Sequence, residues 1–368
     1  MTMPPLVCRR CGATHPVESL VWRCDCGGVM DVLDNPAALS FTAGQQARNS
    51  LWRYESVLPV PFDEQISLGE GMSPIVRSRT QPNVRLKLDF LMPTLSFKDR
   101  GAVVLATLAS ALGVRSALTD SSGNAGTAAA AYLARAGIPC RIFVPEATSP
   151  AKLAQIRAHG AEITLVAGTR ADTATAAREM ASQPGIFYAS HVFHPYFAHG
   201  VKTYGYEIWE QSGGLLPDTV VVPAGNGTLV LGCHLAFREL VEAGLADRMP
   251  TLVAVQAAGC APVAEAFRSG RPDLAAATGT GSTVAEGIAI ADPPRGAQML
   301  AAIRDSGGTV MTVSDDEILA ARAELATEGL YVEPTSAVCW AAVRRDVNGL
   351  DSGDVVIPLC GAGIKAGP

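Results

Sequence analysis

The segment Leu95-Ser96-Phe97-Lys98-Asp99-Arg100-Gly101 joins two different kinds of sequence. The run before it, Arg85-Leu86-Lys87-Leu88-Asp89, resembles a short strand, and the Ala-, Val- and Leu-rich stretch after it predicts a helix that begins near Asp99. Lys98 therefore precedes a helix N-terminus, where the helix dipole disfavours a cation. A desolvated lysine can act as a base or nucleophile. The alternative is a surface lysine whose stem packs on the helix and whose amine is in water.

The composition bounds the protein class. The chain has 368 residues, of which 48% are hydrophobic and 17% charged, as in a globular protein of about two domains. Its net charge of −6 and the lack of a long basic run argue against nucleic acid or an anionic membrane as partner. No apolar run reaches membrane-spanning length and no signal-peptide pattern is present, so we expect a cytoplasmic protein.

The nine cysteines do not form the pattern of a disulfide framework. Four of them, Cys8, Cys11, Cys24 and Cys26, form two close pairs on either side of a short apolar and aromatic stretch. This arrangement resembles a zinc ribbon, in which four thiolates hold a structural ion, although a single residue separates the second pair. The alternative is a set of metal-free reduced thiols, and either way we expect a structural role for residues 1–34.

After residue 50 the pattern alternates between short apolar runs and Ala- and Leu-rich segments of helical length. This alternation predicts an α/β fold with mostly parallel sheets, in which ligands collect at the carboxyl ends of the strands. The predicted strands are 115–119, 140–144, 162–166, 219–222, 251–255, 309–313 and 355–358.

Three loops follow such strands. Ser121-Ser122-Gly123-Asn124-Ala125-Gly126-Thr127 offers small polar groups at a predicted helix N-terminus, which suits a carboxylate, although a helix cap without a ligand explains part of it. Pro223-Ala224-Gly225-Asn226-Gly227-Thr228 is a glycine-rich turn that suits phosphate. A dinucleotide is disfavoured there because the next strand ends in Gln256 rather than an acid. The third loop, 358–365, contains Cys360, which could face a cofactor or lie in the core.

Together and in this order, these segments resemble the fold type II enzymes that depend on pyridoxal 5′-phosphate (PLP), and among them the threonine synthase family. The likeness extends from the cysteine pairs, which many threonine synthases also carry, to the C-terminus. It implies a tryptophan synthase β-like fold of two open α/β domains and a homodimer. The matching segments are 93–101, 121–126, 225–228, Glu286-Gly287-Ile288, Glu328-Gly329-Leu330-Tyr331-Val332-Glu333-Pro334 and 360–363.

The resemblance implies a role for each matching residue. Lys98 would carry PLP as a Schiff base and move protons at the α and β carbons of the substrate. Asn124 would bond the 3′ oxygen of PLP, and Cys360 would lie beside the pyridine nitrogen, where the family usually has Ser or Thr. The cofactor phosphate would be held by Gly225, Asn226, Gly227 and Thr228, with Gly287 beside the ring, and the substrate carboxylate by Ser121, Ser122, Gly123 and Ala125.

One segment departs from the family pattern. Threonine synthases typically have Asn-Ser-x-Asn-Pro-Tyr-Arg where this chain has His191-Val192-Phe193-His194-Pro195-Tyr196-Phe197, and that arginine binds the phosphate of the substrate. Phe197 cannot make this bidentate contact, which argues against O-phospho-L-homoserine as substrate. His191 and His194 could bind an anion or transfer protons, or could be hydrogen-bonded loop histidines. Leu95 also replaces a glycine that is common before the lysine.

The sequence thus predicts a PLP-dependent lyase that performs elimination or replacement on a small L-amino acid. The family reaction converts O-phospho-L-homoserine and water to L-threonine and phosphate. The alternatives are a serine or threonine dehydratase or β-replacement enzyme and, from another class, a binding protein on a dead enzyme fold. A large PLP-binding domain would comprise residues 50–98 and 190–368, and a small mobile domain residues 99–189.

Overall fold

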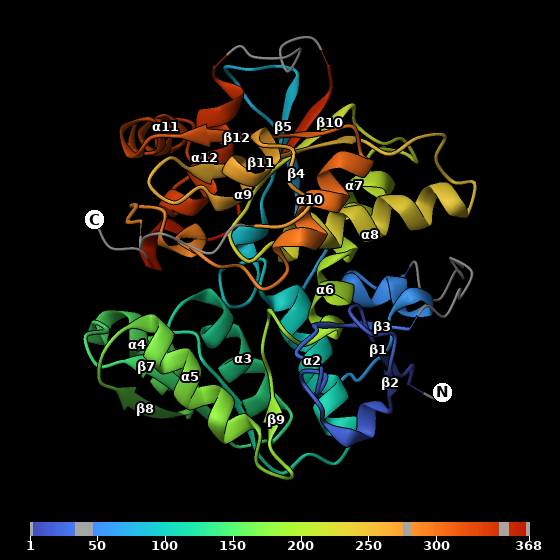
Figure 1. Cartoon of the computed structure of the whole chain (residues 1–368). Coiled ribbons are helices and arrows are strands. Elements are labelled where there is room, and N and C mark those ends of the chain that lie inside the picture. The colour runs from blue at the N-terminus through green and yellow to red at the C-terminus, as the bar shows by residue number, and fades with distance from the viewer. Residues whose placement is uncertain (1–2, 34–46, 275–280, 346–352, 366–368) are drawn as a thin grey trace. The chain divides into compact units, whose positions relative to one another are not determined.

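The computed structural model describes residues 3–33, 47–274, 281–345 and 353–365, and the chain forms two compact units (Figure 1). The first unit comprises Met1–Gly71 and Lys98–Val201, and the second comprises Met72–Phe97 and Lys202–Pro368. Residues 50–71 and 190–201 thus pack with residues 99–189, whereas the sequence assigned them to the large domain. The division into large and small domains stays a prediction about the working enzyme.

The first unit holds two sheets. A small antiparallel sheet of order β2-β1-β3 carries the cysteine pairs, and a parallel sheet of order β8-β7-β6-β9 follows it. Along the chain, the helices of this unit alternate with the strands of the parallel sheet. In chain order the elements are β1 Leu6–Cys8, β2 Thr14–His15, η1 Val17–Ser19, β3 Met30–Val32, η2 Leu51–Val57, α2 Asp99–Ala111, β6 Ala117–Thr119, α3 Asn124–Arg135, β7 Cys140–Pro145, α4 Pro150–Ala158, β8 Glu162–Val166, α5 Arg170–Ala181, β9 Phe187–Tyr188 and α6 Pro195–Val201.

The second unit is built on a six-stranded sheet of order β12-β11-β10-β13-β5-β4. Its strands run parallel except β4, which pairs antiparallel with β5 at the edge. Its elements are β4 Ile75–Arg77, β5 Val84–Lys87, η3 Asp89–Leu91, α7 Thr203–Gln211, β10 Thr219–Pro223, α8 Thr228–Glu242, β11 Thr251–Ala257, α9 Pro262–Arg268, η4 Glu286–Ile288, α10 Gly296–Asp305, β12 Thr309–Val313, α11 Asp315–Thr327, α12 Pro334–Val343, β13 Val355–Pro358 and η5 Gly363–Lys365.

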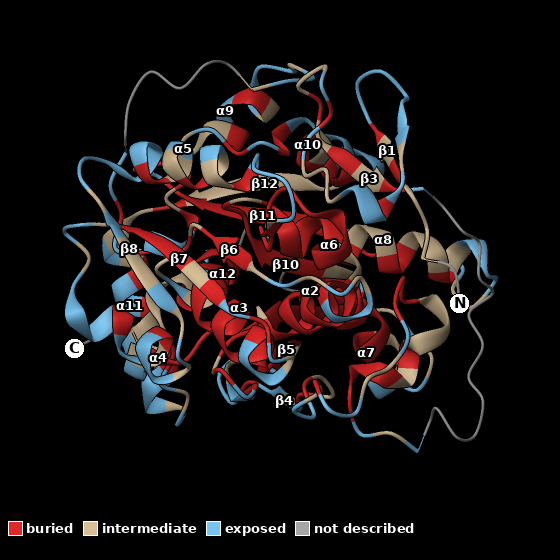
Figure 2. Ribbon diagram, turned by 90° about the horizontal axis from the view of Figure 1, so that it is seen from below, coloured by how far each residue is buried: buried red, intermediate tan, exposed pale blue. Residues whose placement is uncertain are grey.

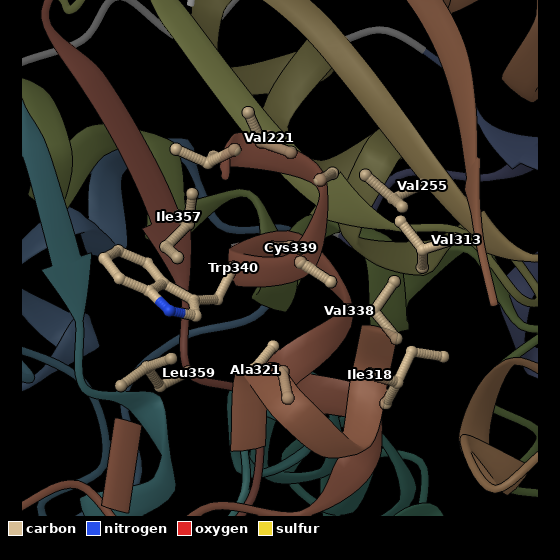
Figure 3. Close-up of a cluster of buried hydrophobic side chains, with 14 of the residues drawn as sticks. Val221, Val255, Val313, Ile318, Ala321, Val338, Cys339, Trp340, Ile357 and Leu359 are labelled. Atoms are coloured by element: carbon tan, nitrogen blue, oxygen red, sulfur yellow. The ribbon is translucent and has the colours of Figure 1, made fainter. Parts of the chain in front are cut away.

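The core of the second unit lies between its sheet and α12. Figure 3 shows Val338, Cys339 and Trp340 of α12 among strand residues, including Val221 and Val255. α11 packs on α12, and its start is fixed by a capping box in which Ser314 and Glu317 bond each other's backbone N–H. All seven strands predicted after residue 100 are present, as is the helix that begins at Asp99. Across the described ranges no helix combines the length and the apolar character needed to cross a bilayer.

A buried ion pair ties β5 to α7 in the second unit. Lys87 Nζ lies 2.6 Å from Glu207 Oε2, and both side chains are fully buried. The amine also donates to the Ser73 carbonyl at 2.6 Å and to Gln211 Oε1 at 3.0 Å. A buried charge is tolerated when an opposite charge and hydrogen bonds compensate for its lost hydration. Removing one member of the pair leaves the other buried without this compensation.

We expect Lys87→Met to lower the free energy of unfolding by about 3–5 kcal/mol, because Glu207 would remain buried without its counter-ion. The measurement is the urea midpoint of unfolding, followed by circular dichroism. The double variant Lys87→Met/Glu207→Leu is the matched control and should recover most of the loss. A wild-type midpoint for the single variant would contradict this account.

Candidate active site

Lys98 is the N-cap residue of α2, as the sequence predicts. Its carbonyl accepts the Ala102 N–H at 3.0 Å, and its side chain is half-buried. Three residues earlier, Leu95 has φ 63°, a left-handed conformation that costs a branched side chain roughly 1 kcal/mol or more. A glycine would adopt this backbone without that cost. The tight turn that presents Lys98 is therefore a strained one.

Phe197 of α6 lies beside Lys98. The Lys98 Nζ is 5.9 Å from the Phe197 ring centroid, and the Phe197 side chain is buried. Helices α2 and α6 approach closely: a β-carbon on Gly101 would lie 2.5 Å from the Phe197 ring, and one on Gly200 would lie 2.1 Å from the Arg100 carbonyl oxygen. Figure 2 shows both helices as mostly buried. The position of this ring next to the lysine is fixed by helix packing.

The two candidate histidines differ in their surroundings. The His191 ring centroid lies 5.9 Å from that of Phe197, and His191 lines a small cavity with Phe197, Ala189 and alanine and leucine side chains of α2 and α3. Desolvation, followed by the charges of Lys98 and Arg170, lowers the pKa of His191 well below its usual range. A neutral imidazole can donate a hydrogen bond to an anion but adds no charge to the interaction.

His194 lies deeper in the first unit. Its side chain is buried, and its ring contacts Phe187 at 5.2 Å and Tyr196 at 5.4 Å between centroids. This aromatic setting favours a core role over substrate binding. The assignment of His194 to the substrate stays a prediction with little support from its contacts.

The predicted carboxylate loop connects β6 to α3. Ser121 is buried, and its hydroxyl is 3.4 Å from the Gly123 nitrogen, within reach of that N–H. A β-carbon on Gly126 would lie only 1.7 Å from the Ser121 carbonyl oxygen, so the loop folds directly onto the first turn of α3. Asn124 and Ala125 form that first turn. The loop therefore brings Ser121, Ser122, Gly123, Asn124 and Ala125 together at a helix N-terminus, where backbone N–H groups suit an anion.

In the second unit, the predicted phosphate loop connects β10 to α8. A β-carbon on Gly225 would lie 2.9 Å from the Gly287 carbonyl oxygen, so these two predicted residues are brought together. Gly227 has φ 82° and faces Met299, and Asn226 and Thr228 complete the turn into the 15-residue helix α8. Gly225 and Gly227 lack the side chains that would clash at these positions, and their backbone N–H groups can approach a phosphate.

Gln256 supports this loop, a role that the sequence did not reveal. The buried amide donates to the Ala224 carbonyl at 3.0 Å and accepts from the N–H groups of Val263 and Ala264 at 2.9 and 3.0 Å. The missing acid at the end of this strand is therefore replaced by a group that holds the loop. The only signal in the sequence was a polar residue at the end of an apolar strand.

Cys360 follows β13 and is fully buried. Its carbonyl accepts the Phe97 N–H at 2.9 Å, which ties the residue before Lys98 to this loop. Ser96 forms a β-bridge with Gly361, and its buried hydroxyl has no hydrogen-bond partner among the described residues. An orphaned buried hydroxyl beside a candidate cofactor position fits a site that is completed by a bound group.

The four cysteines of the first unit also come together. Their sulfur atoms lie within 4.8 Å of one another, with Cys8 and Cys26 3.4 Å apart and Cys11 and Cys24 3.6 Å apart. Four thiolates bound tetrahedrally to zinc at ~2.3 Å would lie about 3.8 Å apart. The donor set and spacing thus fit a structural zinc ion.

Comparison with known proteins identifies the family of the chain. Residues 66–361 match the family described as pyridoxal-phosphate dependent enzyme. The chain is 34% identical to a threonine synthase of Methanosarcina acetivorans over 354 residues, covering 93% of this chain and 87% of that protein. It is 35% identical to a threonine synthase of Mycobacterium tuberculosis over 324 residues, covering 85% and 87%.

A solved structure gives the same answer for the fold. The crystal structure of a threonine deaminase from T.th. is similar with a TM-score of 0.65 and 26% identity, covering 79% of this chain and 92% of that one. The expected fold type II architecture is therefore confirmed. The chain belongs to the family of pyridoxal-phosphate dependent enzymes, and within it is a threonine synthase-like lyase.

Proposed function

We propose that the chain converts O-phospho-L-homoserine and water to L-threonine and phosphate, with Lys98 as its catalytic residue. The observation that carries this proposal is the 34% identity to a threonine synthase over 93% of the chain. Lys98 and the loop residues 121–128, 225–228 and 360 also lie within the family match of residues 66–361. We also propose that the protein is a cytoplasmic homodimer, the dimer being what the resemblance to threonine synthases implies. PLP, when bound, supplies the electron sink that makes the α proton of an amino acid removable.

The chain's own residues would hold the cofactor and guide the proton. The Gly225–Thr228 loop would bind the cofactor phosphate, Asn124 and Cys360 would contact the ring, and Gly287 would pack beside it. A thiol is a weak hydrogen-bond donor, so Cys360 can stand where a hydroxyl is usual. The Ser121–Ala125 loop would orient the substrate carboxylate, which leaves the α proton for Lys98.

A second candidate, elimination from unphosphorylated L-threonine or L-serine to a 2-oxo acid and ammonia, is favoured by Phe197. A charge-assisted hydrogen bond contributes about 1.5–3 kcal/mol, and the phenyl ring at this position offers none. Burial, followed by the charges of Lys98 and Arg170, lowers the pKa of the neighbouring His191 and so disfavours the cation that could replace the arginine. A substrate side chain without phosphate would pack against the Phe197 ring without leaving a negative charge unpaired.

We expect Lys98→Ala to lose the absorption of lysine-bound PLP near the violet edge of the visible range, and all turnover with it, because no other group can form that bond at the same place. The measurement is an absorption spectrum of the PLP-loaded protein. Lys152→Ala, at an exposed lysine of α4, is the control and should keep the spectrum. An unchanged spectrum in the Lys98 variant would remove Lys98 from the mechanism.

Two product assays separate the candidate reactions. With O-phospho-L-homoserine, we expect phosphate and threonine to appear in equal amounts, because the relatives that cover most of the chain are threonine synthases. With L-threonine or L-serine, we expect little 2-oxo acid. The reverse pattern, with the absorption of bound PLP intact, would establish the second candidate.

We also propose that Cys8, Cys11, Cys24 and Cys26 hold a structural zinc ion. The wild-type protein, expressed with zinc in the medium, should contain about one zinc ion per chain, measured by inductively coupled plasma mass spectrometry. Cys11→Ser removes one exposed ligand and should lose most of the metal, whereas Cys140→Ala, at a buried cysteine of β7, should retain it. A wild-type protein without zinc would contradict the proposal.

A further inference from the structure

Trp22 connects the cysteine segment to the rest of the first unit. It lies between the two cysteine pairs, two residues before Cys24, and its side chain is half-buried. Its ring meets the Tyr188 ring edge-on at 5.3 Å and the Phe193 ring at 5.1 Å between centroids, with interplanar angles of 90° and 74°. Such edge-to-face pairs stabilise a defined geometry beyond simple burial.

The Tyr188 contact leads to the predicted carboxylate loop. The Tyr188 hydroxyl donates to Asp120 Oδ1 at 2.9 Å, and Asp120 immediately precedes Ser121. In the sheet Tyr188 pairs with Leu118, and the Ala189 N–H bonds the Leu118 carbonyl at 2.9 Å. Burial raises the pKa of both Asp120 and Tyr188, which fits a hydrogen bond shielded from water.

The Phe193 contact leads to the segment beside Lys98. Phe193 lies in a tight turn in which the Ser190 hydroxyl accepts its N–H at 3.2 Å and the Ser190 carbonyl accepts the His194 N–H at 3.1 Å. The same turn carries His191, whose ring meets Phe197 beside Lys98. A shift of Phe193 would therefore move the wall of the candidate site.

A second contact holds the N-terminal segment on this wall. The Tyr196 hydroxyl donates to the Pro4 carbonyl at 2.7 Å, and α6 packs against β3. These contacts lie on either side of Trp22 in the sequence and hold the N-terminal segment against α6. The Trp22 ring contacts Phe193 of the segment 191–197 directly and reaches the loop 121–125 through Tyr188 and Asp120.

We propose that Trp22 is a positioning residue that sets the carboxylate loop 121–125 and the wall 191–197 for substrate binding. That these two segments bind an amino acid rests on the proposed function. That Trp22 holds them in place rests on the contacts described above. A simple hydrophobic anchor would affect stability alone. A positioning residue also affects the affinity for an amino acid.

The test compares three variants of the full-length, PLP-loaded protein. L-Threonine is the probe, because it is the product of one candidate reaction and a substrate of the other. Trp22→Ala should retain PLP and its visible absorption but bind L-threonine about tenfold more weakly, since small displacements of substrate-positioning groups are costly. Trp22→Phe, which keeps an aromatic edge, should lie within about twofold of wild type.

Trp209→Ala is the matched control, because Trp209 is a half-buried tryptophan of the second unit that donates to the Leu245 carbonyl. It should leave the L-threonine affinity unchanged. Amide hydrogen exchange supplies a readout without ligand: in Trp22→Ala the N–H groups of Ala189, Phe193 and His194 should exchange about tenfold faster or more. Tyr188→Phe, which loses only the bond to Asp120, should loosen the loop after β6 and spare Phe193.

Wild-type affinity and exchange in Trp22→Ala would overturn the proposal, as would an equal loss of affinity in Trp22→Phe or Trp209→Ala. A wild-type protein whose spectrum does not respond to L-threonine would instead count against the proposed function. In that case faster exchange at Phe193 and His194 in Trp22→Ala would still support the positioning role, and unchanged exchange would overturn it.

Discussion

Helices α2 and α6 touch without room for a β-carbon at Gly101 or Gly200, and the candidate site in the first unit depends on this contact. The close approach holds the Phe197 ring over the start of α2, 5.9 Å from the Lys98 amine. An aromatic face attracts a nearby cation by about 0.5–1 kcal/mol at exposed sites, while the apolar ring also displaces water. The ring beside the lysine is thus placed by helix packing, which is more rigid than a loop.

The same principle shapes the loops of both units. Ser121 folds onto Gly126, and Gly225 folds onto Gly287, at distances that only glycine permits. Each loop follows a parallel strand and opens a helix, so its backbone N–H groups gather where an anion would be bound. Gln256 then ties the second loop to α9, because its amide donates to the Ala224 carbonyl and accepts the N–H groups of Val263 and Ala264. Preorganised backbone, rather than charged side chains, characterises these loops.

Much of this arrangement could be predicted from the sequence because its signals are local. Apolar runs such as 219–222 and 309–313 have the length of buried strands. A Lys before a helix, or a Gly-rich turn after a strand, can be recognised from a few consecutive residues. The contacts that join distant segments could not be predicted, because nothing near Trp22 in the sequence points to Tyr188 or Phe193. The role of Gln256 was hidden for the same reason. The assignment of residues 50–71 and 190–201 to a unit likewise depends on long-range packing.

The wall beside Lys98 raises a question of charge that the other candidate residues do not. Every amino acid substrate has a carboxylate and an α proton. The loop 121–125 is the candidate partner of the carboxylate, and Lys98 is the candidate base for the α proton. The side chain is what differs, and a phosphate carries about two negative charges at neutral pH. Phe197 offers no charge, and burial together with the charges of Lys98 and Arg170 lowers the pKa of His191, which disfavours its charged form. On the proposal that this segment faces the substrate side chain, a phosphorylated substrate would need its counter-charge from residues other than Phe197 and His191.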